Sequence, residues 1–98
     1  MNKYKHLTAP QAQLDFHDKG HLTEKDIIQI TNDFIKTSVQ NGFDRVLIIT
    51  GKGIHSRNGQ AIVKPLVQKY LERHANVASV FKGRRDRGGS GALEIKLI

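Results

Sequence analysis

The sequence predicts one small α/β domain in which a mixed sheet is packed by two helices. Strand-like and helix-like segments alternate along the 98 residues in the order β-α-β-α-β-β. Such an alternation favours a partly parallel sheet with helices against it and right-handed crossovers. A chain of this length builds one modest core, so a single domain is expected. The expected strands are 14–17, 45–49, 77–81 and 92–98, and the expected helices are 24–40 and 62–74.

Both helices carry sequence signals at their ends. Thr23 offers an N-cap with Asp26 three residues later, which is a capping-box arrangement. Asn41-Gly42 supplies a stop signal for this first helix. In the second helix, Pro65 is expected within the first turn, where its missing N–H costs nothing.

The strands differ in the number of faces that they bury. Leu14 and Phe16 alternate with polar residues, which predicts one buried face. The run 45–49 is apolar on both faces, as expected of a central and largely parallel strand. In the last strand, apolar residues alternate with Glu94 and Lys96. Residues 1–13 are polar and are expected to form a flexible arm ahead of a domain spanning 14–98.

Composition narrows the class of partner. The net charge of +7 and the sequence pI near 10.0 point toward a polyanion, although some small basic proteins are simply soluble. The absence of cysteine excludes disulfides and thiolate metal sites. No apolar run approaches the ~20 residues of a membrane span, and the N-terminus lacks a signal-peptide apolar region. We therefore expect a cytoplasmic protein with no membrane partner.

A glycine-rich loop follows the strand 45–49 and has the chemistry of a phosphate contact. Two glycines flanking a lysine let backbone N–H groups approach an anion closely. The spacing differs from a Walker A loop, because Val46 stands where that motif needs glycine. A glycine also follows the lysine where that motif needs Ser or Thr. The residues expected at the phosphate are Thr50, Gly51, Lys52, Gly53, His55, Ser56 and Arg57.

A second basic loop spans 82–91. Four cations within six residues, interleaved with glycine, can track a phosphate backbone, and arginine adds bidentate contacts and base stacking. The alternative is a solvated hairpin connection in which glycines are expected anyway. The residues expected to contact nucleic acid are Lys82, Arg84, Arg85, Arg87, Gly88, Gly89 and Gly91.

Asp15 and His17 are candidates for catalysis because side chains two apart on a strand point the same way. A carboxylate beside an imidazole can orient it, raise its basicity, or share a divalent cation such as Mg²⁺ or Mn²⁺ with phosphate oxygens. Alternatively, His17 bonds backbone while Asp15 caps or pairs with a lysine. If the first two strands are parallel, His17 and Thr50 open on the same sheet edge, where ligands of α/β sheets bind.

Other polar and aromatic residues receive structural interpretations. His6, His21 and His74 have no partner at metal-ligand spacing and are expected at the surface. The carboxylate cluster that a two-metal nuclease uses is missing, so no metal site is predicted. All aromatic residues except Tyr4 and Phe16 are expected in the core, which leaves no aromatic-rich strand face for reading single strands.

Three motifs, in order, resemble those of the Smr (small MutS-related) domain family. They are Leu14-Asp15-Phe16-His17, Thr50-Gly51-Lys52-Gly53 and Gly88-Gly89-Ser90-Gly91-Ala92, which are similar to the family's LDxH, TGxG and GGxGA motifs. The resemblance spans about 14–98. It implies a fold like the C-terminal domain of bacterial translation initiation factor three. It also implies nucleic-acid binding, with endonuclease activity on DNA or RNA in several members.

The resemblance also implies roles for particular residues. It associates Asp15 and His17 with cleavage, and the loop 50–53 with binding or catalysis. The chain departs from the family where Asp18-Lys19 precede Gly20, because members usually have glycine directly after the motif's histidine. We expect a nucleic-acid-binding domain with endonuclease (nicking) activity. The alternatives are a non-catalytic DNA- or RNA-binding module on the same surface, and an interaction domain that meets acidic protein or ribosomal RNA.

Overall fold

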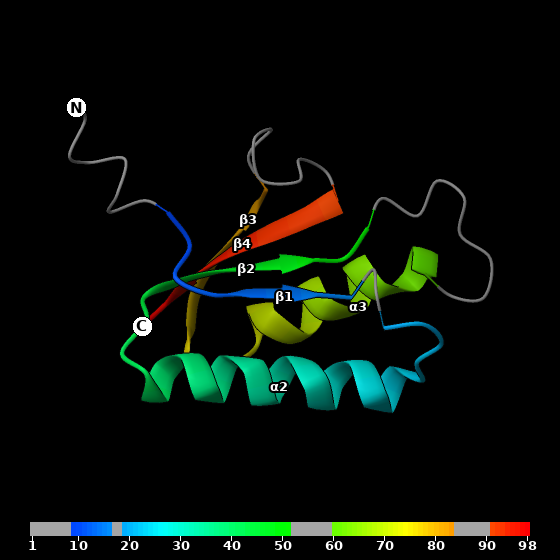
Figure 1. Cartoon of the computed structure of the whole chain (residues 1–98), viewed down its shortest axis with the longest axis horizontal. Coiled ribbons are helices and arrows are strands. Elements are labelled where there is room, and N and C mark those ends of the chain that lie inside the picture. The colour runs from blue at the N-terminus through cyan, green and yellow to red at the C-terminus, as the bar shows by residue number, and fades with distance from the viewer. Residues whose placement is uncertain (1–8, 17–18, 52–59, 84–90) are drawn as a thin grey trace.

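A mixed sheet carries two helices on one face (Figure 1). The computed structural model describes residues 9–16, 19–51, 60–83 and 91–98. Its elements are β1 (Gln13–Asp15), α2 (Glu24–Gln40), β2 (Arg45–Ile49), α3 (Gln60–Glu72), β3 (Val77–Lys82) and β4 (Ala92–Leu97). This order confirms the predicted β-α-β-α-β-β class. None of the helices within the described residues is both long and apolar enough to span a membrane.

The strand order within the described residues is β1-β2-β4-β3. β1 runs parallel to β2, whereas β4 is antiparallel to both β2 and β3. The parallel start agrees with a helical crossover through α2. β2 is central as predicted, but only its β1 side is parallel. β4 comes last along the chain and is inserted between β2 and β3.

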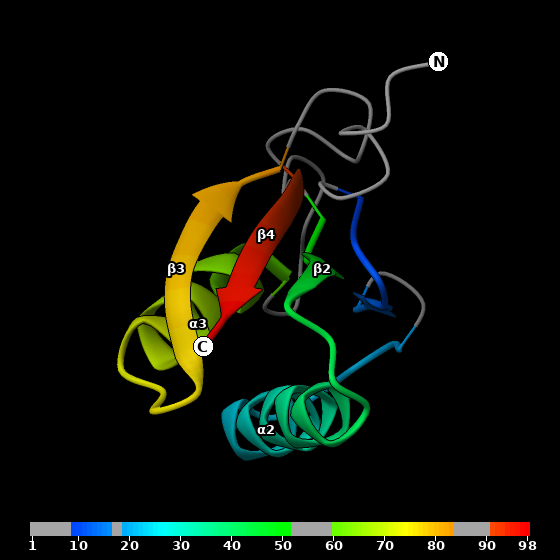
Figure 2. The same ribbon diagram turned by 90° about the vertical axis from the view of Figure 1, so that its left-hand side faces the viewer.

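The core lies between the sheet and the helices. Alternate strand residues point to the helices, and Figure 2 shows both helices on the same side of the strands. Leu14 and Phe16 are both buried in this core, as their alternation predicts. The core residues are Leu14, Phe16, Ile27, Ile35, Val46, Ile48, Val63, Val67, Leu71, Leu93, Ile95 and Leu97.

The opposite side of the sheet, here called the open face, carries the other alternate residues. Cross-strand register aligns Gln13 with Leu47, Leu47 with Glu94, and Glu94 with Phe81. Leu47 and Glu94 are buried, although both helices lie on the other side of the sheet. The alternating pattern of β4 indicates that Glu94 lies on an exposed polar face, but the structure buries this residue.

Helix α2 begins and ends where its signals predict. The Thr23 hydroxyl accepts from the Asp26 N–H at 3.1 Å, and the Asp26 carboxylate accepts from the Thr23 N–H at 3.1 Å. Hydrogen bonds with Thr23 hold the pKa of Asp26 below its ordinary value, and the bond from the Thr23 backbone N–H has the largest effect. At the other end, Gly42 has φ +75°, the left-handed conformation that ends helices with little strain.

Two expectations about local structure are wrong. Helix α3 begins at Gln60, so Pro65 lies inside the helix rather than in its first turn. Its missing N–H removes one bond of the helix, which packing of Val67 and Leu71 into the core must offset. The other concerns Phe81, which was expected in the core but is 49% exposed.

Hydrogen bonds to β2 and to the residue before it begin ahead of residue 14. The Gln11 N–H donates to the Arg45 carbonyl at 2.8 Å, and the Gln11 side-chain oxygen accepts from the N–H groups of Asp44 and Arg45. The Leu47 N–H donates to the Ala12 carbonyl at 3.0 Å. Gln11 and Ala12 therefore hydrogen-bond to the segment 44–47, and Gln13 is the first residue of β1.

We expect Thr23→Ala to lower the free energy of unfolding by about 1 kcal/mol, because an N-cap hydroxyl is lost. Thr23→Ser keeps the capping oxygen and is the matched control. Urea denaturation followed by circular dichroism measures both. Equal losses in the two variants would contradict a role for the hydroxyl.

Candidate functional site

The carboxyl ends of β1 and β2 meet the amino end of β4 at one edge of the sheet. Asp15 is the register partner of Ile49, and Ile49 is the register partner of Ala92. β3 ends at the same edge, because the Gly83 N–H donates to the Ala92 carbonyl at 2.8 Å. The parallel pairing of β1 and β2 thus brings the end of β1 to the same edge as Thr50, as expected, and the roles of these residues stay predictions. We call this group the strand-end site, comprising Asp15, Thr50, Gly51, Lys82 and Gly91.

The Gly91 carbonyl holds the two loops together at this edge. It accepts from the Thr50 N–H at 2.9 Å, from the Gly51 N–H at 3.0 Å and from the Thr50 hydroxyl at 3.3 Å. The Thr50 hydroxyl also lies 3.2 Å from the Gly51 carbonyl, and Thr50 is only 3% exposed. Thr50 therefore joins the start of one loop to the end of the other.

These bonds engage the backbone N–H of Gly51. Its N–H was a candidate donor to phosphate, but it already donates to the Gly91 carbonyl. Gly51 has φ +80°, which glycine adopts without the steric cost of a Cβ. The glycine is needed here for the turn of the backbone away from β2.

Asp15 is placed by a rigid backbone. Its strand, β1, pairs with β2. The hydrogen bonding between these strands continues beyond Asp15, because the Phe16 N–H donates to the Ile49 carbonyl at 2.8 Å. Phe16 is buried, so the alternation turns the half-buried Asp15 toward the open face. A carboxylate is thus held at the end of β1, level with the last residue of β2 and, beyond it, the first residue of β4.

The geometry agrees with comparisons to known proteins. The family model described as the Smr domain matches residues 14–98. The chain belongs to the Smr domain family. It is 28% identical over 85 residues to "Endonuclease NBR9" of Saccharomyces cerevisiae, covering 87% of this chain and 32% of the relative. It is 31% identical to "Endonuclease MutS2" of Streptococcus pyogenes serotype M49, covering 92% of this chain and 10% of the relative.

A solved structure also resembles this Smr domain. YdaL, a stand-alone small MutS-related protein from Escherichia coli, superposes with a TM-score of 0.76 at 28% identity. The match covers 90% of this chain and 66% of YdaL. The chain spans less than half of the length of the two curated relatives. The fold and the family are therefore shown, and the activity of the longer relatives is a property of those proteins.

Part of the predicted site of this Smr domain lies outside the described residues. The roles expected for these residues stay predictions. They are His17, Lys52, Gly53, His55, Ser56, Arg57, Arg84, Arg85, Arg87, Gly88 and Gly89.

The described part of the site offers little to a metal ion. Within residues 9–16, 19–51, 60–83 and 91–98, no three His, Cys, Asp or Glu side chains gather closely enough to hold one. At the strand ends, Asp15 supplies a carboxylate. Glu94 lies on the far side of β2, two residues along β4 from Ala92, which is level with Asp15. A cation at Asp15 would need further ligands from elsewhere, including phosphate oxygens.

Sequence reasoning missed the open face as a candidate surface. Arg45 and Lys96 are direct register partners there, and Phe81 is exposed on the neighbouring strand. The alternation of apolar and charged residues in β4 already indicated a second face of the sheet. Reading it needed the register between strands that are far apart in sequence.

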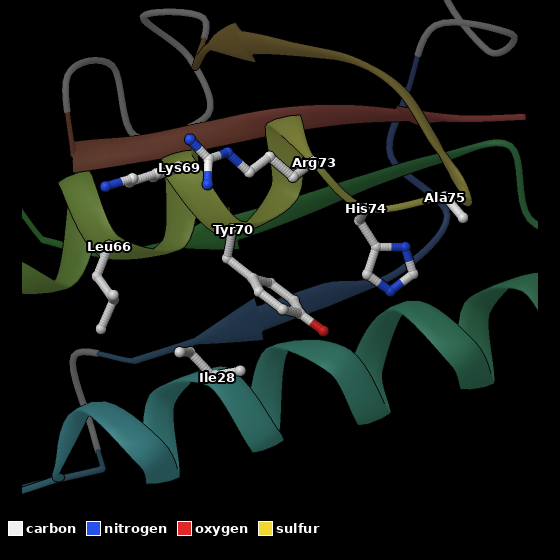
Figure 3. A pocket seen from close by; sticks show the side chains of 7 residues that line it. All are labelled: Ile28, Leu66, Lys69, Tyr70, Arg73, His74 and Ala75. Carbon is white, nitrogen blue, oxygen red and sulfur yellow. The ribbon is translucent and has the colours of Figure 1, made fainter.

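A cavity of about 520 Å³ lies on the other side of the sheet, between α2 and α3 (Figure 3). Apolar and aromatic side chains form its walls, together with two cations, Lys69 of α3 and Arg73 directly after that helix. The lining residues are Ile28, Leu66, Lys69, Tyr70, Arg73, His74 and Ala75. The volume lies in the range of small-ligand pockets.

His74 of this cavity is half-buried, which corrects its expected surface position. Its Nδ1 accepts from the Asn76 N–H at 3.1 Å, so Nε2 carries the proton and donates to Asn32 Oδ1 at 3.0 Å. Burial is the main cause that holds the pKa of His74 below its ordinary value of 6.5, and the positive charge of Lys36 lowers this pKa further. Both ring nitrogens are already used, so His74 here is a structural group rather than a catalytic base.

The stability of this Smr domain should fall on acidification partly through His74. Because the folded-state pKa is lowered, the unfolded chain binds more protons just below pH 6.5, and the free energy of unfolding rises with pH there. The free energy of unfolding of wild type should exceed that of His74→Gln most at pH 8, and this difference should shrink toward about pH 5. Urea titrations across this range measure the difference. A constant difference would contradict the assignment.

Thr50→Val should lower the free energy of unfolding by about 1 kcal/mol, because it keeps the shape and deletes a buried donor. Thr50→Ser keeps the hydroxyl and should retain the bond to the Gly91 carbonyl, at the cost of one methyl group. Chemical denaturation gives the two values. A Val variant as stable as wild type would show that the hydroxyl does not hold the loops together.

Proposed function

We propose that this Smr domain binds nucleic acid and cleaves its phosphodiester bonds as an endonuclease of DNA or RNA. One observation carries the proposal: Asp15 ends β1 at the same edge of the sheet where Thr50 follows β2 and Gly91 precedes β4. Both loops are basic in sequence, and the net charge of +7 suits a polyanionic substrate. The names of NBR9 and MutS2 as endonucleases support the same class of reaction.

The proposed reaction needs a proton acceptor and positive charge near one phosphate. His17 takes a proton from the attacking water or hydroxyl, and Asp15 orients and stabilises the imidazolium. The new P–O bond forms as the bond to the leaving oxygen breaks, that oxygen takes up a proton from solvent water, and the imidazolium returns its proton to solvent. Lys52, Lys82 and the arginines of 84–87 neutralise the charge that develops on the phosphate.

The position of Asp15 also bears on the alternative, a module that binds without cutting. A carboxylate repels phosphate, so a surface that only binds has no use for one beside its basic loops. The half-buried Asp15 is a better partner for an imidazole than for the substrate itself. This favours cleavage over binding alone.

Asp15→Asn and His17→Ala should each slow cleavage by about 10²–10⁴-fold, the usual contribution of general acid–base catalysis. Binding should stay near that of wild type. The assay uses supercoiled plasmid and structured RNA, each with Mg²⁺, Mn²⁺ or chelator. Asp44→Asn makes the same chemical change at the other end of the sheet, just before β2, and should cleave like wild type.

Each result of this assay bears on a different part of the proposal. Cleavage that survives both substitutions would place the activity elsewhere. Binding without cleavage in wild type, under all three metal conditions, would leave the non-catalytic module as the function. Loss of activity in chelator alone would add a divalent cation to the mechanism.

A further inference from the structure

The cavity between α2 and α3 presents apolar and aromatic side chains to solvent (Figure 3). Ile28 lies on its α2 side, and Leu66 and Tyr70 lie on its α3 side. Each of these three side chains is partly exposed, so the walls are within reach of a ligand. A molecule that enters the cavity of about 520 Å³ removes this apolar surface from water, which is favourable.

The walls of this cavity are held in place by contacts between the helices. His74 follows α3 and reaches α2, because its Nε2 donates to Asn32 Oδ1 at 3.0 Å. Its Nδ1 accepts from the Asn76 N–H at 3.1 Å, which fixes the ring. The Tyr70 ring meets the His74 ring edge-on, with centroids 5.6 Å apart and 75° between the ring planes. A ligand therefore meets a preformed wall and loses less affinity to ordering the protein.

Two cations stand beside these apolar walls. Lys69 lies in the last turn of α3 and Arg73 directly follows the helix, so they are about one helical turn apart. Like charges at this spacing repel each other. Among the described residues, no acid forms an ion pair or a hydrogen bond with either side chain. An anion bound beside the cavity would be attracted by both cations.

The charges around the cavity are unevenly placed. Burial raises the pKa of Tyr70, and the nearby carboxylate of Asp33 on α2 raises it further, so the hydroxyl stays protonated. The positive charge of Lys36 acts on His74 at another part of the wall. An anionic group is therefore disfavoured beside the Tyr70 hydroxyl and favoured on the α3 side, where the two cations lie.

We propose that the cavity between α2 and α3 binds a small amphipathic anion, a flat apolar molecule that carries one carboxylate or a similar group. Its apolar body lies against Ile28, Leu66 and Tyr70, and its anionic group lies against Lys69 and Arg73. The apolar contact supplies most of the affinity, because exposed ion pairs contribute little, and the cations select the sign of the charge. None of these residues belongs to the strand-end site, so this inference is independent of the proposed function.

The test uses 2-naphthoate, an aromatic carboxylate, and 2-naphthamide, a neutral compound of nearly the same shape. Two-dimensional NMR of the ¹⁵N-labelled protein locates the binding site and gives both dissociation constants. Wild type should bind 2-naphthoate with a dissociation constant of about 1 mM or lower. It should bind 2-naphthamide about tenfold more weakly. The resonances that shift should be those of Ile28 and of residues 66–75.

Three variants separate the charges from the apolar wall. Lys69→Gln/Arg73→Gln should weaken binding of 2-naphthoate about tenfold and leave that of 2-naphthamide unchanged. Arg45→Gln/Lys96→Gln removes the same two charges from residues that do not line the cavity, and should bind both compounds like wild type. Leu66→Gln keeps the length of the side chain but makes the wall polar, so it should weaken both compounds by about the same factor.

Each contrary result overturns the site. Shifts centred on Thr50 and Gly91 would place the anion at the strand-end site instead. Equal affinity of wild type for the two compounds would remove the role of the cations, and equal losses in the two double variants would leave only general attraction. The absence of any shift at millimolar 2-naphthoate would show that the cavity does not bind this class of ligand. Circular dichroism of each variant confirms that it has folded.

Discussion

The antiparallel pairing of β4 with β2 is the interaction on which the rest of the structure depends. It joins segments that are distant in sequence, and it extends without a break from Arg45–Lys96 to Ile49–Ala92. At one end it brings the Gly91 carbonyl to Thr50 and Gly51. Along its length it places buried apolar residues against the helices and a charged row on the open face. The core, the strand-end site and the open face therefore share one hydrogen-bonded ladder.

Much of the fold could be predicted from local signals. The capping box of Thr23 and the stop at Gly42 fixed α2, because caps satisfy backbone groups that any helix leaves unpaired. The two-faced apolar run predicted that β2 is central. The parallel pairing of β1 and β2 follows from the helix between them, and it places Asp15 and Thr50 at one edge. These features depend on neighbours within a few residues or on general rules of connection.

The remaining features depend on contacts that no local pattern states. Gly51 looked like a donor to an anion, yet its N–H is bonded to a carbonyl that lies far along the chain. Glu94 alternates with apolar residues as an exposed charge does, yet it is buried. Phe81 looks like a core residue in an apolar strand, but β3 is an edge strand and turns it toward solvent. Each of these depends on the register of β4, which sequence periodicity does not reveal.

The central position of β4 has a consequence for how the molecule acquires its chemistry. Thr50 and the Gly91 carbonyl that accepts its hydroxyl are 41 positions apart, and closing a loop of that size precedes any gain from the contact. A chain that has formed α2, β2 and α3 but has not inserted β4 has neither a joined pair of loops nor a cation pair on its sheet. The contacts that join the two loops therefore depend on a pairing between segments that are distant in sequence.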